Sequence, residues 1–504
     1  MSERGTAINR RGFIVGAGAA AAGVARVRRA AAQAARPLVL VEPTDPRSLD
    51  PLFRDDEIAG TVHRHIFDTP MHRFPDSSIR PWAAEAVERQ SATVWMVRLR
   101  ENMHFTNGEP VDAEALRYSY ERIVNPDNKS TIRSLISPAG KIQVQDARTV
   151  LFDTGNPDPL FTARLIWMQM VPPKYAAEAG AQFGTRPIGS GPYILKRWQR
   201  NSEIVFEANP NHWRGKPAYP DVTFKIIPEE IARVSALRSG DVDVILSLSS
   251  TQADAVSKLP GFKVLAQPTS RVAVLNFNPA APPADNAKLR RAVALAVNRE
   301  ELLKGLAKSL GLPVTTLFAA SVGNLPTGVR TDFPYDPEEA RKLVDEAGLK
   351  GKEVQVGGPS GRFPLDRETV SAVAAQLRRV GLDAKARVTE FGTYVSDITS
   401  GRAASVFLQV QGNAWFDPMP QIEAFYRTGG LGSPWKDPSI DALLDRTYKV
   451  PEDQRTAAIG DILKRIHDDT LSVPLYGYAE QDATTDRIKW QPRVDQLMLA
   501  FEMS

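Results

Sequence analysis

The stretch that decides the fold covers residues 187–245 and reads PIGSGPYILKRWQRNSEIVFEANPNHWRGKPAYPDVTFKIIPEEIARVSALRSGDVDVI. Turn residues at its start lead into an apolar run at Tyr193, and the patterns over 202–208 and 222–227 predict two further strands. A helix follows, and Gly240 stands where a left-handed residue can end it. The chain then returns to a strand, which is the connectivity of an α/β layer.

Several motifs give the stretch a more specific meaning. They are GSGPY at 189–193, NPNHW at 209–213 and LRSGDVD at 237–243, with NGEPVDAE at 107–114 further upstream. Together they resemble the family 5 extracellular solute-binding proteins, periplasmic receptors that supply peptides, opines, sugars or nickel complexes to ABC importers. The resemblance covers nearly the whole chain after the N-terminal segment. It implies a two-lobed α/β fold of the type II, Venus-flytrap kind, with an extra α/β subdomain in lobe one.

The length and the net charge of the chain limit its number of domains and its class of partner. A chain of 504 residues exceeds what one hydrophobic core usually serves, so at least two domains are expected. The net charge is +4, but residues 1–34 carry six arginines against one glutamate, or +5. Everything after residue 34 therefore sums to 4 − 5 = −1. The basic charge lies in the N-terminal segment, and a nucleic-acid partner is not expected.

That N-terminal segment has the features of an export signal. Arg10 and Arg11 form a twin-arginine motif, 13–25 is a short apolar stretch, and Ala-Gln-Ala at 32–34 offers a cleavage site. A surface amphipathic helix is the alternative. We interpret 1–35 as a Tat signal peptide and expect a periplasmic protein. The chain contains no cysteine, which removes thiol catalysis, thiolate metal sites and a lipid-anchoring cysteine.

The resemblance also predicts the domain organisation. Two hinge segments are expected, near 266–276 and 470–478. The expected parts are the signal at 1–35, lobe one at 36–270 with an inserted subdomain at about 60–180, lobe two at 271–470, and a return to lobe one at 471–504.

Signatures of catalysis are missing from the sequence. It has no G-x-S-x-G elbow, no phosphate-binding loop and no carboxylate pair with a spacing typical of acid–base work. We therefore expect neither an enzyme nor a cofactor; the alternative is a Tat-exported hydrolase, a peptidase or a glycosidase. His63, His65 and His72 form the only histidine cluster. We expect His63 and His65 to be partly exposed, and no metal site.

The resemblance points to two ligand-binding positions in lobe two. Arg362 occupies the place of an arginine that clamps the ligand carboxylate in dipeptide receptors, a task suited to a permanently charged, two-pronged guanidinium. A solvated arginine paired with Asp366 is the alternative. Asn413 falls where those receptors carry an aspartate for the ligand's amino group. Because asparagine supplies no negative charge, a ligand that is anionic or neutral at this end is favoured.

Further candidates surround these two. Asp417 could replace the missing aspartate, or it could be a structural turn residue. Trp415 and Phe416 could offer apolar or stacking contacts. Phe53 and Arg47 on the first-lobe loop, and Asn276 on the crossing strand, are the remaining candidates. We predict a monomeric receptor that closes on a peptide-like or other carboxylate-bearing solute and delivers it to an ABC permease; the solute class stays open.

Overall fold

The computed structural model describes residues 36–54, 57–136, 141–360 and 362–504. The predicted export signal lies outside the described residues. Within them, no helix is both long and apolar enough to cross a membrane.

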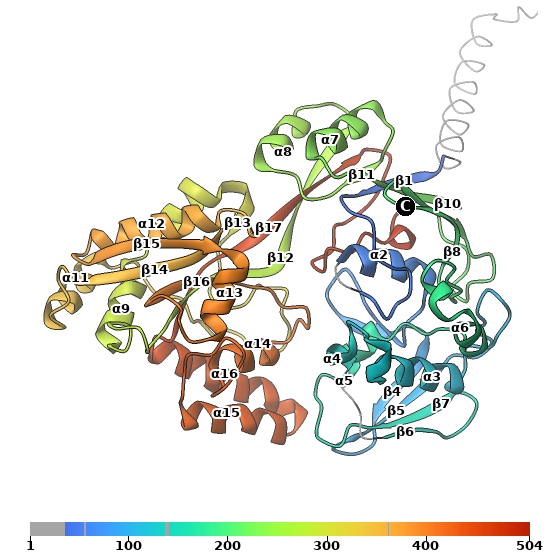
Figure 1. The fold of residues 1–504 in the computed structure, drawn as a ribbon, viewed down its shortest axis with the longest axis horizontal. Helices are drawn as coiled ribbons and strands as arrows, with labels where there is room; N and C mark the ends of the chain where they lie inside the picture. The colour runs from blue at the N-terminus through green and yellow to red at the C-terminus, as the bar shows by residue number, and fades with distance from the viewer. Residues whose placement is uncertain (1–35, 55–56, 137–140, 361) are drawn as a thin grey trace, which may run out of the picture.

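One large mixed sheet runs through both halves of the molecule (Figure 1). Its order is β15-β14-β16-β12-β17-β11-β1-β10-β9-β8, and β13 pairs with β17 beside that path. The strands are β1 (Leu38–Glu42), β8 (Tyr193–Gln199), β9 (Glu203–Ala208), β10 (Asp221–Ile226), β11 (Val244–Ile245), β12 (Phe262–Phe277), β13 (Gly311–Leu312), β14 (Glu353–Ser360), β15 (Asp383–Glu390), β16 (Val406–Gln411) and β17 (Ser472–Thr485). The two-lobed α/β class predicted from the motifs is confirmed.

Lobe one holds the end of this sheet at which β1 lies parallel to both β10 and β11. A separate four-stranded sheet, in the order β4-β5-β7-β6, lies below it in Figure 1. Its strands are β4 (Ala84–Arg89), β5 (Val94–Leu99), β6 (Lys141–Val144) and β7 (Thr149–Asp153), and β2 (Met71–Arg73) pairs with β3 (Ile79–Pro81). The helices of this lobe are α2 (Glu57–Ile66), α3 (Ala113–Val124), α4 (Arg133–Ile136), α5 (Phe161–Arg164), α6 (Pro173–Ala179), α7 (Glu230–Ser239) and α8 (Ser250–Ser257).

Lobe two packs helices against β14, β15 and β16, with a helical group at its lower end (Figure 1). These helices are α9 (Ala287–Ala296), α10 (Arg299–Glu301), α11 (Pro337–Glu346), α12 (Asp366–Arg378), α13 (Phe391–Thr399), α14 (Met419–Tyr426), α15 (Pro438–Lys449) and α16 (Glu452–Asp468). At the start of α11, Asp336 caps the helix by accepting the backbone N–H of Glu339 at 3.0 Å.

Two long antiparallel strands connect the lobes. β12 has 16 residues and β17 has 14, and they pair along most of their length. Their register shifts between Pro268 and Val272, where Pro268 lacks a backbone N–H for the ladder. Residues 269–271 therefore leave regular pairing near the middle of the crossing. The predicted domain boundary at 270/271 lies inside β12; the boundaries themselves stay predictions.

The opening stretch forms the strands and helix that its pattern predicts. Gly240 ends α7 with φ +78, the left-handed conformation expected of it. Two glycines at the start of this stretch, Gly189 and Gly191, have a further role. A Cβ on Gly189 would lie 2.0 Å from the carbonyl oxygen of Ile66, and the N–H of Gly191 donates to that same oxygen at 2.8 Å. Only glycine allows this approach, which fixes the C-terminal end of α2 against β8.

Candidate interlobe binding site

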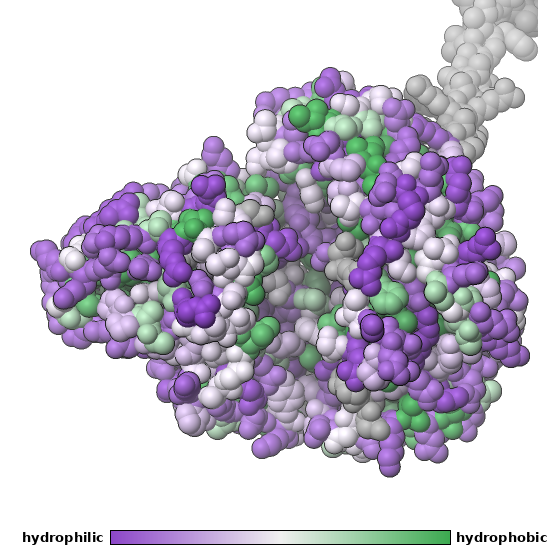
Figure 2. Space-filling view, in the orientation of Figure 1, coloured by the Kyte–Doolittle hydropathy of each residue, from purple (hydrophilic) through white to green (hydrophobic). Residues whose placement is uncertain are grey.

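A cavity of about 200 Å³ lies between the two lobes, where the space-filling surface is hollowed (Figure 2). Two larger chambers, about 410 Å³ and about 470 Å³, adjoin it. The first shares Glu57, Arg271 and Gln496 with the central cavity, and the second shares Arg73 and Phe416. The three chambers therefore adjoin one another, and together they make up the interlobe cleft, which segments of both lobes line.

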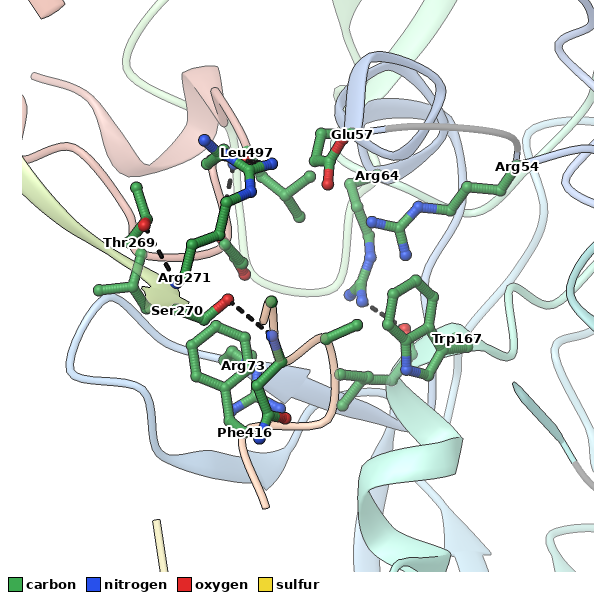
Figure 3. A pocket seen from close by; sticks show the side chains of 17 residues that line it. Arg54, Glu57, Arg64, Arg73, Trp167, Thr269, Ser270, Arg271, Phe416 and Leu497 are labelled. Atoms are coloured by element: carbon green, nitrogen blue, oxygen red, sulfur yellow. Dashed lines mark hydrogen bonds between the residues drawn. The ribbon is translucent and has the colours of Figure 1, made fainter. Parts of the chain in front are cut away.

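Arginines dominate the wall of the central cavity (Figure 3). The charged residues that line it are Arg54, Arg64, Arg73 and Arg271 against Glu57 and Asp495. Asp495 is already engaged, because the Arg493 guanidinium bonds to both of its oxygens at 2.8 and 2.6 Å. Burial alone would raise the pKa of Asp495, but Arg493 outweighs it and lowers that pKa to about 2.

Arg64, on the last turn of α2, is one of two deeply enclosed cations in this wall. It is 5% exposed, and its Nη1 donates to Thr69 Oγ1 at 3.0 Å and to His72 Nδ1 at 3.2 Å. Its Nη2 donates to the Ile166 carbonyl. Among the described residues, no carboxylate pairs with Arg64, and its Nε–H has no acceptor. Burial, together with the nearby Arg54 charge, lowers the pKa of Arg64 to about 9.

Arg73, at the end of β2, is the second buried guanidinium and is 3% exposed. Nη1 donates to the Ser77 carbonyl at 3.0 Å, and Nη2 donates across the cleft to the Trp415 carbonyl at 3.1 Å. Burial lowers its pKa to about 10. In the part of the chain that the structure describes, Arg73 also lacks a carboxylate partner. Both enclosed cations thus donate to neutral acceptors only. The Asp495 charge acts on each of them but is already bonded to Arg493, so a further anion in the cavity would be favourable.

The other two arginines are placed differently. The guanidinium of Arg54 lies 4.0 Å from the centre of the Trp167 ring. Arg271, at the irregular part of β12, bonds to Glu480 and to Gln496 Oε1, each at 3.1 Å. Two guanidiniums of the cavity wall thus lie over aromatic rings, Arg54 over Trp167 and Arg73 over Phe416. Such planar cations suit a planar anionic group.

The histidine cluster differs from its prediction. His63 and His65 are fully buried and His72 is 2% exposed, so the expectation of partial exposure is wrong. The cause is α2, which packs between the sheet of lobe one and the C-terminal segment. Ala500 N–H donates to His65 Nε2 at 3.1 Å, and burial lowers the pKa values of His65 and His72 to about 4. Among the residues described, no group of three or more His, Cys, Asp or Glu side chains could hold a metal ion.

The structure brings most of the predicted site residues to the cleft. Asn413 and Phe416 line the central cavity, Trp415 and Asp417 line the adjoining 470 Å³ chamber, and Arg362 lines the 410 Å³ chamber. The Arg362 guanidinium lies 5.2 Å from the ring centre of Phe363 rather than against the Asp366 carboxylate. Asp366 instead accepts the backbone N–H of Arg362 at 3.2 Å.

Asn413 and Asp417 belong to a buried network. Asn413 Nδ2 donates to the Asp417 carbonyl at 2.8 Å and to Gln421 Oε1 at 3.3 Å. Both oxygens of Asp417 are bound by Arg455, at 2.7 and 2.9 Å, and the pair is almost fully enclosed. This pairing supports the alternative of a structural turn aspartate, while ligand contact by Asp417 stays a prediction.

Three candidates lie elsewhere. Phe53 lines a pocket formed by lobe one alone, and the Arg47 guanidinium lies 5.0 Å from its ring centre. Asn276 is buried in the sheet of lobe two, where it bonds to Gln409 and Ser472. None of these three lines the interlobe chambers.

Sequence reasoning missed Arg54, Arg64, Arg73 and Arg271. The stretch HRHIFDTPMHR at 63–73 carried a usable signal. It places two arginines and three histidines within a helix and strand that also carry apolar core residues, and polar side chains enclosed in that way need a partner. For Arg271 the sequence offered only its position three residues after Pro268, a residue that interrupts strand pairing.

The comparisons with known proteins agree with this architecture. The family described as bacterial extracellular solute-binding proteins, family 5 Middle, matches residues 78–433. The chain belongs to this family. It is 28% identical over 437 residues to the nickel-binding periplasmic protein of Escherichia coli, covering 79% of this chain and 81% of that protein.

Two further matches extend the comparison. A probable di/tripeptide-binding protein 5 of Pseudomonas aeruginosa is 27% identical over 410 residues, which cover 75% of this chain and 77% of that protein. The structure of HbpA2 from Haemophilus parasuis has a TM-score of 0.85 at 19% identity, over 93% of this chain and 99% of that chain. The predicted family is thus confirmed, and solute binding is favoured over the hydrolase alternative.

Proposed function

We propose that the interlobe cleft binds a small anionic solute, with Arg64 and Arg73 as its principal charge partners. The observation that carries this proposal is the enclosure of both guanidiniums without a carboxylate partner among the described residues. A carboxylate of the solute would supply the missing counter-charge and acceptors. Because Asp417 is engaged by Arg455, the cleft offers no free carboxylate at the loop that carries Asn413. An anionic end of the solute there is therefore favoured over an ammonium group.

The neighbouring chamber suggests how a longer solute would lie. Arg362 is exposed in it, together with the Arg271–Glu480 pair. A solute whose anion rests between Arg64 and Arg73 would extend past Glu57 toward Arg362. In this arrangement Arg362 is a second contact and not the primary clamp.

The transport role follows from the two-sided site. A solute that touches both lobes binds the closed state better than the open state, and so shifts the population toward closure. Bending is proposed at the crossing segments near 266–276 and 470–478. The closed monomer, exported to the periplasm by its twin-arginine signal, would then dock on the permease of an ABC importer and perform no chemical step itself.

The test is a ligand screen on the purified mature protein. Thermal shifts are measured with monocarboxylates, dicarboxylates, di- and tripeptides, neutral sugars and cationic amino acid amides, and hits are titrated by calorimetry. Anionic solutes should stabilise the protein, and Arg64→Gln should weaken their binding roughly 10- to 100-fold. Arg80→Ala, at an exposed arginine outside the cleft, is the control. A screen in which only neutral or cationic compounds bind would overturn the anion assignment, and turnover of any compound would overturn the receptor role.

A further inference from the structure

A histidine bonds to the buried Arg64 on one side and to the Glu502 carboxylate on the other. Arg64 Nη1 lies 3.2 Å from His72 Nδ1, and His72 Nε2 lies 3.0 Å from Glu502 Oε1. A guanidinium can only donate, so Nδ1 accepts and the ring proton stands on Nε2, directed at Glu502. The imidazole is therefore neutral, in one defined tautomer.

The surroundings of His72 fix this orientation. Its ring stacks on Trp82 with centroids 4.5 Å apart and meets Phe74 edge-on at 5.0 Å. Behind it, both oxygens of Glu502 accept hydrogen bonds from Arg493 Nη1, at 3.0 and 2.8 Å. The charges that face His72 are thus Arg64 on one side and the Glu502–Arg493 pair on the other.

This arrangement has an electrostatic consequence. Arg64 is held by three neutral acceptors, namely Thr69 Oγ1, His72 Nδ1 and the Ile166 carbonyl. If a carboxylate stood where His72 stands, it would hold Arg64 equally well but would also neutralise it. The imidazole instead passes a hydrogen bond on to Glu502 and keeps that carboxylate out of contact with the guanidinium.

We propose that His72 is a positioning residue that fixes Arg64 for the solute while leaving Arg64 without a carboxylate in contact with it. The inference rests on the proposed anion site. It also makes His72 a determinant of specificity, because the preference for anions depends on Arg64 donating only to neutral acceptors within the protein.

Two conservative substitutions of His72 distinguish the effect of its hydrogen bond to Arg64 from that of its hydrogen bond to Glu502. Asparagine at position 72 places its oxygen near the position of Nδ1 and can still accept from Arg64. Glutamine reaches toward Glu502 but leaves Arg64 without that acceptor. We expect His72→Gln to weaken binding of succinate roughly 10- to 100-fold and His72→Asn to stay within about threefold of the wild type. His65→Asn is the matched control, since His65 is equally buried in α2 but bonds to Thr61 and Ala500.

A second measurement needs no solute. Nitrogen NMR of the ligand-free protein should show His72 as the neutral Nε2–H tautomer. It should also show restricted rotation of the Arg64 guanidinium in the wild type and in His72→Asn, but not in His72→Gln. A protonated or Nδ1–H His72, or equal Arg64 signals in all variants, would overturn the inference. If those signals behave as expected but neither succinate nor inorganic phosphate binds the wild type, the proposed anion site fails and the positioning of Arg64 stands.

Discussion

The guanidinium of Arg73 lies 4.0 Å from the centre of the Phe416 ring, across the cleft between the lobes. The same guanidinium donates to the Trp415 carbonyl at 3.1 Å, so one side chain of lobe one holds two consecutive residues of lobe two. Phe416 has φ +56, a left-handed conformation that costs a non-glycine residue roughly 1–2 kcal/mol. The contact with Arg73 helps to offset that cost. Arg73 is thus both a cation of the site and a connection between the lobes.

Removing Arg73 should therefore have two separable effects. Arg73→Ala should weaken the binding of anionic solutes roughly 10- to 100-fold. It should also shift the ligand-free protein toward a more open shape, because the Phe416 and Trp415 contacts are lost. Calorimetry measures the first effect and the radius of gyration from X-ray scattering the second. Arg80→Ala is the control, since Arg80 covers the Phe74 ring at 3.7 Å within lobe one. An unchanged scattering profile would contradict the connecting role.

The Asp417–Arg455 pair should be a structural element of lobe two. Arg455→Ala leaves the enclosed Asp417 carboxylate without its charge partner and should lower the free energy of unfolding by about 3–5 kcal/mol. Chemical denaturation measures this loss. Arg446→Ala is the matched control, because its ion pair with Asp461 joins α15 and α16 on the exposed surface and should cost less than about 1 kcal/mol. Equal losses in the two variants would show that the pair contributes no more than a surface contact.

Asn413→Asp would restore the aspartate that dipeptide receptors carry at this position, but the structure predicts that the variant is destabilised. The new carboxylate would lose both donors of the amide and would face the Asp417 carbonyl and Gln421 Oε1. We expect a loss of at least about 2 kcal/mol in the free energy of unfolding and no gain in peptide affinity. Asn211→Asp, at an exposed turn residue, is the control. A stable variant with tighter binding of free-amine peptides would contradict this expectation and would assign position 413 to the ligand's amino group.

The fold could be predicted because its signals are local. Gly240 ends α7, and Asp336 begins α11, through bonds within a few residues of each. The loop with Asn413 and Phe416 was located by a family motif that is itself a short sequence. The strand pattern of 187–245 needed no knowledge of the rest of the chain.

The cation site could not be predicted in the same way, because its members meet only in space. Arg64 and Arg73 come from one end of lobe one, whereas Arg271 projects from an irregularity in β12. Whether an arginine is paired depends on distant carboxylates, and Asp495 and Glu502 are both engaged by Arg493. Local sequence shows the presence of a charge but not the absence of its partner.

Arg362 should contribute less to binding than Arg64. It is exposed in the outer chamber, where solvent screens its charge, and it is not enclosed by neutral acceptors. Arg362→Ala should therefore weaken the binding of a short dicarboxylate by less than about threefold, and it should weaken the binding of longer anionic solutes more. Calorimetry with dicarboxylates of increasing length measures this trend. If Arg362→Ala abolishes binding of the shortest solute, Arg362 is the primary clamp, as the sequence resemblance implied.

Asp482 in β17 should make stability depend on pH. It is 4% exposed, and burial raises its pKa to about 7, against the opposing hydrogen bond from the Ser247 N–H at 3.0 Å. A carboxyl whose pKa is higher in the folded state than its ordinary 3.8 makes the protein lose stability as pH rises from about 4 to 7, and the loss is complete above 7.

Asp482→Asn keeps an oxygen for Ser247 but cannot ionise. The variant should therefore gain roughly 2–3 kcal/mol of stability over the wild type between pH 5 and pH 8, measured by denaturation at both values. Asp486→Asn, at an exposed carboxylate just beyond the same strand, is the control and should show no such gain. Parallel pH profiles of Asp482→Asn and the wild type would mean that Asp482 is ionised in the folded protein, with its charge accommodated between β17 and Ser247.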